Sequence, residues 1–358
     1  MDWQRLHLDK TLLFALLGLA VISLFVVYSG SAKDVNATLG HFMRLLLGFT
    51  VLVVVAQLRP EIIERWAPYV FIGGMLLLIA VLAIGVIGKG AQRWLNLGLF
   101  RFQPSELMKL AVPMMLAWFL ARANLPPTLP RLAAAFFMMA VPAFMIMKQP
   151  DLGTALLVFS AGVFVLFLAG MHWRIILLLL AAIVIAAPFA WNYLHDYQRQ
   201  RILTMFNPEA DPLGTGYHTI QAMIAVGSGG IYGKGWLNSS QAHLDYLPES
   251  STDFIFAVFA EEFGLIGSLL LVAIYALIVA RSLLIAYLAK DTFTRLLAGS
   301  LSLTFFLYFF VNIGMVTGIL PIVGIPLPVM SYGGTSIVTI MATFGILMSI
   351  QTHRKIAE

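Results

Sequence analysis

The sequence predicts an all-α integral membrane protein, and three observations lead to this class. Hydrophobic residues make up 60% of the chain and charged residues only 11%, whereas a soluble domain carries about 25% charged residues. Apolar runs of about 20 residues, the length that crosses a bilayer as a helix, recur along the chain. Basic residues gather between alternate runs, as the positive-inside rule requires. We therefore expect a single polytopic membrane domain over residues 1–358.

About ten transmembrane helices are expected from these runs. The first, 11–30, is longer than the apolar core of a signal peptide, which has about 7–15 residues, so we interpret it as a retained helix. The other expected spans are 39–58, 67–88, 105–122, 132–148, 152–170, 174–193, 253–280, 295–318 and 333–352.

The distribution of Lys and Arg orients the predicted bundle. With the N-terminus in the cytoplasm, every short cytoplasmic segment carries basic residues, and the C-terminus is cytoplasmic as well. Two segments outside the membrane then stand out by length. They are 89–104 and 194–252, a large extracytoplasmic loop before the eighth helix, in which we expect a short helix at about 217–226. Long ordered loops are commonly functional.

Ten basic residues, Arg44 among them, lie outside or in the outer half of a span, most of them within 89–109 and 199–234. Positive charge is disfavoured on the translocated side of a membrane. We therefore interpret these stretches as the wall of an anion-binding site. The alternative is that the basic residues pair with nearby Asp and Glu.

Arg93, Arg101, Glu106 and Lys109 form the first candidate group. A Pro-Ser pair before Glu106 suits the start of a helix. Glu106 and Lys109, three residues apart, would share one face of that helix. They would form either a simple ion pair or a polar wall in which Arg101 and Lys109 meet a diphosphate, because a planar guanidinium and a compact ammonium both suit phosphate.

Asp151 is the second candidate, in a short turn between the fifth and sixth spans. An Asp at this position is a good N-cap for the sixth helix. It would alternatively pair with Lys148 or Lys109 and organise the anion site.

The third group begins where a polar loop runs into the eighth span. On one helix, Asp253, Ala257 and Glu261 would share a face, with Asp253 at the outer mouth and Glu261 about two turns deeper. A carboxylate at this apolar edge is poorly solvated and can accept a proton from a substrate hydroxyl. The alternative is that Asp253 only caps the helix.

The fourth group is the stretch 320–336, in which three prolines prevent a regular helix. We expect a re-entrant or tightly packed outer loop before the last span. Gly333 and Gly334 permit close approach of the backbone. The stretch is either a structural turn or the lining of a groove for a lipid tail.

Other kinds of chemistry find little support. The absence of cysteine excludes disulfides and thiolates. No His, Asp and Glu spacing marks a dedicated metal site, although Mg²⁺ or Mn²⁺ would need only one or two carboxylates, such as Asp253, together with substrate phosphates. No basic surface interleaved with aromatic residues indicates nucleic acid.

Taken together, the four groups resemble the SEDS family (shape, elongation, division and sporulation), and in particular its RodA branch. The matching stretches follow family order and spacing. They are Arg93-Trp94, 102–106 (FQPSE), 149–154 (QPDLGT), 252–257 (TDFIFA) with 261–264 (EEFG), and 324–328 (GIPLP) with 331–334 (SYGG). The short N-terminus is similar to RodA, since the division counterpart, FtsW, usually carries a longer extension.

The resemblance implies a peptidoglycan glycosyltransferase of the bacterial cytoplasmic (inner) membrane, with its active site facing the periplasm or cell exterior. Such an enzyme polymerises lipid II, a disaccharide-pentapeptide on undecaprenyl diphosphate, for cell elongation and rod shape. Asp253 stands at the family's essential Asp position. The implied partners are a class B penicillin-binding protein (a transpeptidase of the penicillin-binding protein 2 type) and other proteins of the elongation machinery.

These inferences combine into one hypothesis and one rival. In the hypothesis Asp253 is the general base and the basic residues stabilise the departing diphosphate. The expected substrate-binding residues are Arg93, Arg101, Glu106, Lys109, Asp151, Arg201 and Glu261. The rival is a lipid II flippase, which needs a polar path through the membrane; Glu261 and Asn312, which lie deeper, keep it open. A scaffold that only recruits its partner would not explain the outer charges.

Overall fold

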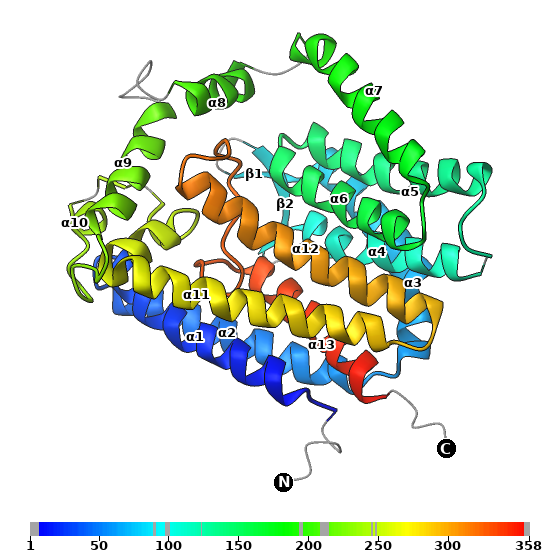
Figure 1. Ribbon diagram of the computed structural model, residues 1–358, viewed down its shortest axis with the longest axis horizontal. Coiled ribbons are helices and arrows are strands. Elements are labelled where there is room, and N and C mark those ends of the chain that lie inside the picture. Colours follow the sequence, from blue (N-terminus) through cyan, green and yellow to red (C-terminus); the bar gives the residue numbers. More distant parts are fainter. Residues whose placement is uncertain are drawn as a thin grey trace.

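The protein is described from a computed structural model and forms a bundle of long helices (Figure 1). The structure describes residues 7–88, 91–96, 101–122, 124–192, 196–207, 215–244, 246–247 and 249–353. The ten expected spans correspond to ten helices. These are α1 (Lys10–Gly30), α2 (Val35–Ala56), α3 (Pro60–Ile84), α4 (Pro104–Ala121), α5 (Leu129–Lys148), α6 (Leu152–Leu168), α7 (Trp173–Trp191), α11 (Ile255–Leu288), α12 (Thr292–Val316) and α13 (Thr335–Thr352).

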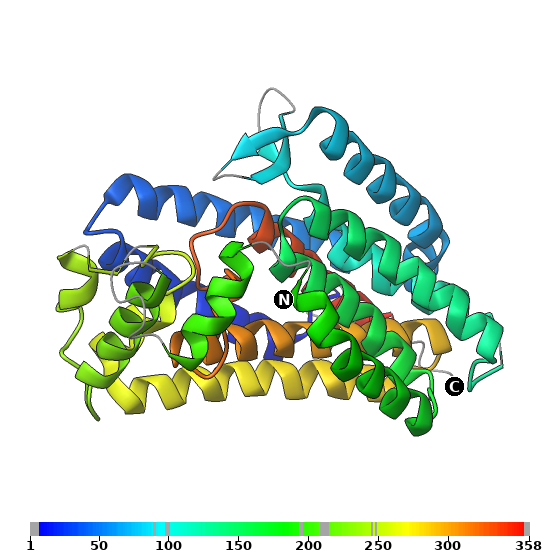
Figure 2. The same ribbon diagram turned by 90° about the horizontal axis from the view of Figure 1, so that it is seen from above.

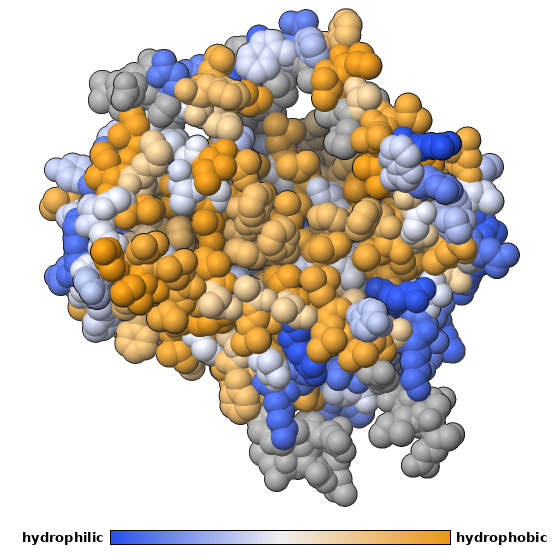
Figure 3. Space-filling model, viewed as in Figure 1, coloured by the Kyte–Doolittle hydropathy of each residue, from blue (hydrophilic) through white to orange (hydrophobic). Residues whose placement is uncertain are grey.

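Within the described residues, seven of these helices are long and apolar enough to cross a membrane: α1, α2, α3, α5, α11, α12 and α13. Another, α6, is apolar but has only 17 residues. Orange, hydrophobic residues cover most of the face shown in Figure 3. Many of them are large and exposed, such as Phe14, Leu270 and Phe310. Since water would not tolerate so much exposed apolar surface, the chain is a multi-pass membrane protein.

The interior of the bundle is formed by α4 and α12. Residues on nearly every side of α12 are buried, and this helix packs against α4, α6 and α11. Figure 1 shows α12 crossing the molecule above α11. On the other side, α13 packs closely against α2. The start and the end of the described chain meet, because the rings of His7 and His353 stack with their centres 3.9 Å apart.

The segment between α3 and α4 corrects the prediction of a purely helical protein. Three short strands form an antiparallel sheet in the order β1-β2-β3: β1 (Val86–Gly88), β2 (Ala91–Asn96) and β3 (Arg101–Phe102). The expected third span, 67–88, therefore ends early. Gly85 ends α3 in an extended conformation, and the β-branched residues that follow favour a strand.

In the described part of the long segment 194–252 there are three helices: α8 (Asp196–Phe206), α9 (Thr215–Ser228) and α10 (Ser240–His243). The expected helix at 217–226 is confirmed and is longer, as α9. In Figure 1 these helices lie at the top and left, away from the start of α1 and the end of α13 at the lower right. Figure 2 shows α9 and α10 grouped at the same end of the bundle.

One break interrupts the longest helix. Gly264 of α11 has φ 64° and ψ −162°, so the helix is divided there. The chain 230–233 fills the break, because Leu265 N donates to Gly230 O (2.9 Å) and Ile266 N donates to Ile231 O (3.1 Å). A Cβ at Gly264 would lie 2.3 Å from Gly233 N. Glycine is therefore required for both its conformation and its size.

Candidate functional site

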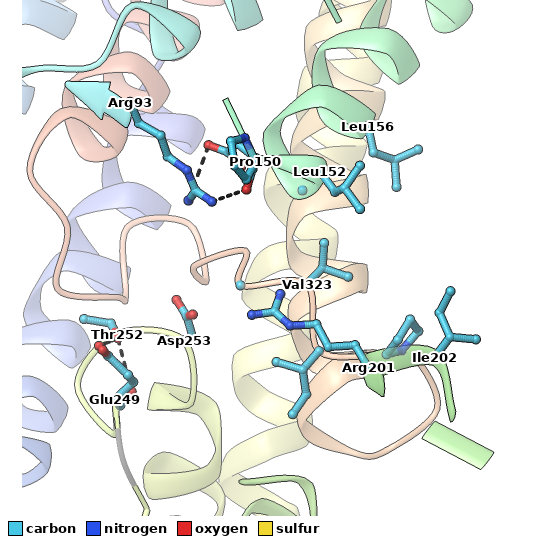
Figure 4. A pocket seen from close by; sticks show the side chains of 15 residues that line it. Arg93, Pro150, Leu152, Leu156, Arg201, Ile202, Glu249, Thr252, Asp253 and Val323 are labelled. Atoms are coloured by element: carbon cyan, nitrogen blue, oxygen red, sulfur yellow. Dashed lines mark hydrogen bonds and ion pairs between the residues drawn. The ribbon is translucent and has the colours of Figure 1, made fainter. Parts of the chain in front are cut away.

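A cavity of about 640 Å³ brings together residues from five segments that are distant in the sequence. It is lined by Arg93, 150–153, Leu156, Arg201, Ile202, Glu249, Thr252, Asp253 and 321–324. Figure 4 shows Arg93 and Pro150 on one side, and Asp253, Thr252 and Glu249 on another. Four of the eight predicted site residues are thus brought together: Arg93, Asp151, Arg201 and Asp253.

Asp253 lies just before α11 rather than on it. The helix begins at Ile255, and its N-cap, Phe254, has no side-chain capping bond. The prediction that Asp253 and Glu261 share a face of one helix is therefore wrong, because Asp253 precedes the helix. Its half-buried side chain instead lies on the cavity wall. A Cβ at Gly324 would lie 3.3 Å from Asp253 Oδ2, so glycine lets the loop approach this carboxylate closely.

Asn312 of α12 holds two walls of the cavity together. Its side-chain Nδ2 donates to the backbone O of Asp253 (2.9 Å) and to the backbone O of Ile325 (2.8 Å). A second link joins the same two segments, because Ser331 Oγ donates to Thr252 O (2.6 Å). The position of Asp253 is therefore set by hydrogen bonds to its own backbone and to that of the preceding residue.

The opposite wall is built around Arg93 of β2. Its Nε donates to Gln149 O (3.2 Å), and its Nη2 donates to Pro150 O. Its Nη1 lies 3.8 Å from Asp151 Oδ2. Asp151 also caps α6, accepting from Thr154 N (3.2 Å). The predicted N-cap is therefore confirmed, whereas the predicted pair with Lys148 or Lys109 is wrong, because the cation beside Asp151 is Arg93 and Lys109 pairs with Glu106.

Glu106 and Lys109 form an ion pair of 2.6 Å inside the bundle, on α4. The side chains are only 7% and 6% exposed, and neither lines the large cavity. The Lys109 ammonium also lies 5.2 Å from the centre of the Tyr308 ring. The simpler of the two sequence interpretations, an intrahelical pair, accounts for this geometry. Arg101 begins β3, and its side chain lies outside the described part of the structure.

Glu261 lies away from the cavity and is completely buried. Its carboxylate accepts from Lys234 Nζ (2.6 Å), Ser239 Oγ (2.6 Å) and Ser240 Oγ (2.7 Å). Backbone N–H groups of Ser240 and Gln241 donate to it as well, at 3.1 and 3.3 Å. These contacts tie the chain between α9 and α10 to α11. The arrangement explains Glu261 without a substrate.

His218 of α9 stands behind the cavity wall. Its ring stacks on Phe254, the neighbour of Asp253, with centres 6.1 Å apart. Burial lowers the pKa of His218; the nearby Arg201 lowers it further and Glu249 raises it. The imidazole is therefore held mainly neutral near pH 7. Sequence reasoning overlooked both His218 and Glu249, since nothing in their local pattern points to the cavity.

The lining combines charged and apolar groups. Arg93 and Arg201 supply positive charge, Asp151, Glu249 and Asp253 supply carboxyl groups, and Leu152, Leu156 and Ile202 supply apolar surface. In the described part of the chain no group of three or more His, Asp or Glu residues is arranged to hold a metal ion. The carboxylates on the wall fit a cation such as Mg²⁺ that takes most of its ligands from phosphate and water.

The fold and the cavity define a class: multi-pass helical membrane proteins with a charged cavity among loops at the helix ends. Residues 9–356 match the model of the cell cycle protein family of FtsW, RodA and SpoVE. The chain belongs to this family, the SEDS family, which confirms the resemblance found in the sequence.

Similar proteins agree with this membership. "Peptidoglycan glycosyltransferase MrdB" of Escherichia coli (strain K12) is 51% identical over 354 residues, which cover 99% of this chain and 96% of the relative. A solved structure titled "Structural coordination of polymerization and crosslinking by a peptidoglycan synthase complex" matches with a TM-score of 0.84 and 29% identity over 97% of both chains. The Thermus thermophilus rod shape determining protein RodA matches with a TM-score of 0.73 and 26% identity over 98% of both chains.

Proposed function

We propose that this protein is a peptidoglycan glycosyltransferase that polymerises lipid II into glycan strands, with Asp253 as the general base. The observation that carries the proposal is the cavity in which Asp253, Arg93 and Arg201 meet beside apolar residues. Such a site suits a substrate that joins a sugar, a diphosphate and a polyprenyl chain. The name of the 51% identical relative supports the same activity.

The proposed reaction balances as a substitution at a sugar carbon. The acceptor hydroxyl gives its proton to the Asp253 carboxylate while its oxygen forms a bond to the anomeric carbon of the donor. The bond from that carbon to the diphosphate oxygen breaks, and undecaprenyl diphosphate leaves. Arg93 and Arg201 stabilise the charge of the leaving group. Attack from the opposite side inverts the anomeric centre, so an α-linked donor becomes a β-linked product.

The remaining predicted residues support this site less directly. Arg101 is proposed to contribute positive charge near the diphosphate. Asp151 orients Arg93. Glu106 neutralises the charge of Lys109 inside the bundle, and this ion pair positions α4. Glu261 holds the segment 234–241 against α11.

A divalent cation, Mg²⁺ or Mn²⁺, is proposed as a cofactor that accompanies the diphosphate. Asp253 or Asp151 would hold it together with phosphate oxygens, and it would neutralise charge on the leaving group. Chelation with EDTA followed by readdition of each ion, with polymer as the readout, tests this requirement.

We further propose that the enzyme acts in cell elongation, in the bacterial inner membrane. Its ten helices would leave both termini in the cytoplasm and turn the cavity toward the periplasm or cell exterior. The similar proteins named MrdB and RodA favour elongation over the division branch. The similar chain from a peptidoglycan synthase complex supports a class B penicillin-binding protein as the partner that crosslinks the strands.

The flippase alternative depended on deep polar residues. Glu261 is occupied by contacts with the outer segment, and Asn312 donates to two backbone carbonyls beside the cavity. In the described part of the chain, neither residue forms part of a continuous row of polar side chains across the bundle. The enzyme is therefore the better-supported function.

The test is polymerisation of labelled lipid II by the purified full chain with its penicillin-binding partner. Asp253→Asn should reduce glycan polymer by at least about 100-fold, the usual scale of general-base catalysis. Asp34→Asn is the matched control, because Asp34 is an exposed N-cap of α2 and Asn caps equally well. Undiminished polymer from a folded, partner-bound Asp253→Asn protein would remove Asp253 as the base.

A further inference from the structure

Arg44 is a cation on a membrane-spanning helix that the proposed reaction does not use. It lies on α2, about 14 Å from the helix start at a rise of 1.5 Å per residue. Its neighbours Phe42, Met43 and Leu47 are exposed apolar side chains, as expected for a surface that faces lipid. An ionisable residue on the apolar surface of a helix that faces lipid is costly and indicates a function and a partner.

The ring of Tyr332 supports the guanidinium. Arg44 Cζ lies 4.2 Å from the ring centre, a cation–π distance. His41, one turn earlier on the same face of α2, also stacks on this ring, with centres 6.1 Å apart. The imidazole is fixed in turn by Ser23, 3.1 Å from Nε2. The guanidinium of Arg44 is therefore held in one orientation against the Tyr332 ring.

The held guanidinium has an unsatisfied donor. Arg44 Nη1 is buried and has no hydrogen-bond partner. The ion pairs among described residues do not include Arg44, whereas Arg281 reaches the Asp9 carboxylate at 2.6 Å. A buried charged donor without an acceptor costs free energy. Among the described residues no acceptor reaches this atom, and a bound ligand would supply one.

This position is linked to the loop that carries Asp253. Tyr332 N donates to Ser251 O (2.8 Å), and the adjacent Ser331 Oγ donates to Thr252 O (2.6 Å). Arg44, His41 and Tyr332 do not line the large cavity. The guanidinium thus lies beside the Asp253 loop but outside its cavity.

We propose that Arg44, supported by Tyr332, binds the phosphate of a membrane lipid in the outer leaflet, at a site separate from the Asp253 cavity. The planar donor fork of Arg fits phosphate oxygens. The exposed apolar residues beside it would contact the lipid chains. Two lipids carry this chemistry, an anionic phospholipid and undecaprenyl diphosphate.

Native mass spectrometry of the full chain in detergent tests the site by lipid affinity, without any measurement of activity. The probes are phosphatidylglycerol, undecaprenyl diphosphate and, as a ligand without phosphate, diacylglycerol. Arg44→Gln should weaken binding of a phosphate lipid by about tenfold or more, the scale of a lost charge-assisted hydrogen bond. Diacylglycerol should bind both proteins equally. The probe whose affinity falls identifies the source of the phosphate.

Lys33→Gln is the matched control, since Lys33 is an exposed cation in the turn before α2. It should leave both affinities unchanged. Equal affinities in wild type and Arg44→Gln, or an equal loss in Lys33→Gln, would overturn the proposal. If Arg44→Gln fails to fold, Arg44→Lys takes its place; it keeps the charge without the fork and should bind with clearly lower affinity. Wild-type affinity in that variant would also overturn the proposal.

Discussion

Two carboxylates lie near the start of α11, and they have opposite surroundings. Asp253 lies before the helix, half-buried on the wall of a cavity of about 640 Å³. Glu261 lies within the helix, has no exposed surface and accepts from four side chains and two backbone groups. The pattern of residue types alone makes the two look alike. Their surroundings divide them into a group open to a substrate and a group that organises the chain.

The difference follows from how each carboxylate is held. Asn312 and Ser331 hold the chain at Asp253 by hydrogen bonds to backbone carbonyls. Glu261 is positioned through the carboxylate itself. The many donors around Glu261 make that carboxylate a poor proton acceptor, because they stabilise its charged form.

The comparison predicts that substitution at the two sites has opposite effects. Glu261→Gln should destabilise the folded state by about 3 kcal/mol, because it leaves Lys234 without its counter-charge and places an amide against several donors. Asp253→Asn, a change of similar size on a half-buried cavity wall, should cost clearly less stability than Glu261→Gln, while activity is lost. Thermal unfolding in detergent and polymer assays, run in parallel, measure both. Loss of stability at Asp253 rather than Glu261 would reverse our interpretation.

Asn312→Leu should break the positioning of Asp253 without touching its carboxylate. Two carbonyls lose their donor, and displacement of a catalytic group by about 1 Å lowers the rate by about 100-fold. The rate of polymerisation should therefore fall by about 100-fold in protein that is still folded, as thermal unfolding in detergent would show. Ser302→Ala, which removes a buried hydroxyl bonded within the same helix, is the control and should retain activity. Full activity in Asn312→Leu would contradict the positioning role.

Arg93→Lys tests the opposite wall. Lysine keeps the charge but has no planar fork for Gln149 O, Pro150 O and Asp151 together. We expect the KM for lipid II to rise by about tenfold, the scale of one lost charge-assisted bond, with a smaller change in kcat. Arg122→Lys, at the other end of α4 on Trp118, should have no such effect. Unchanged KM in Arg93→Lys would remove this residue from substrate binding.

The smallest effect is expected from pH at His218. Burial lowers its pKa below the ordinary 6.5, so the unfolded chain takes up this proton first as pH falls. The stability that depends on neutral His218 is therefore complete above pH 6.5 and declines as pH falls toward the lowered pKa. The melting temperature should drop between pH 7 and pH 5 by more in wild type than in His218→Phe, which preserves the stack on Phe254. Parallel pH profiles would show that His218 has no part in this decline.

The long apolar helices could be predicted because their length is a direct consequence of bilayer thickness, and seven of them are long and apolar enough to cross a membrane in the described part of the chain. The sheet at 86–102 could not, since its strands are short and interrupted. Sequence motifs also brought Arg93, Asp151, Arg201 and Asp253 into one hypothesis. They did not reveal that Ser239 and Ser240 donate hydrogen bonds to the Glu261 carboxylate, because those contacts depend on how the segment between α9 and α10 folds back. Asn312 was visible as a lone amide in an apolar span, but its role required knowledge of its acceptors.

The size and lining of the cavity have a consequence for pharmacology. A volume of about 640 Å³ falls within the range of about 300–1,000 Å³ that accommodates drug-sized ligands. Arg93 and Arg201 favour an acidic group such as a phosphonate, and Leu152 and Leu156 favour a short apolar chain. With the proposed orientation, such a compound would reach its target without entering the cytoplasm. Enzymes of the cytoplasm would then have less opportunity to modify it.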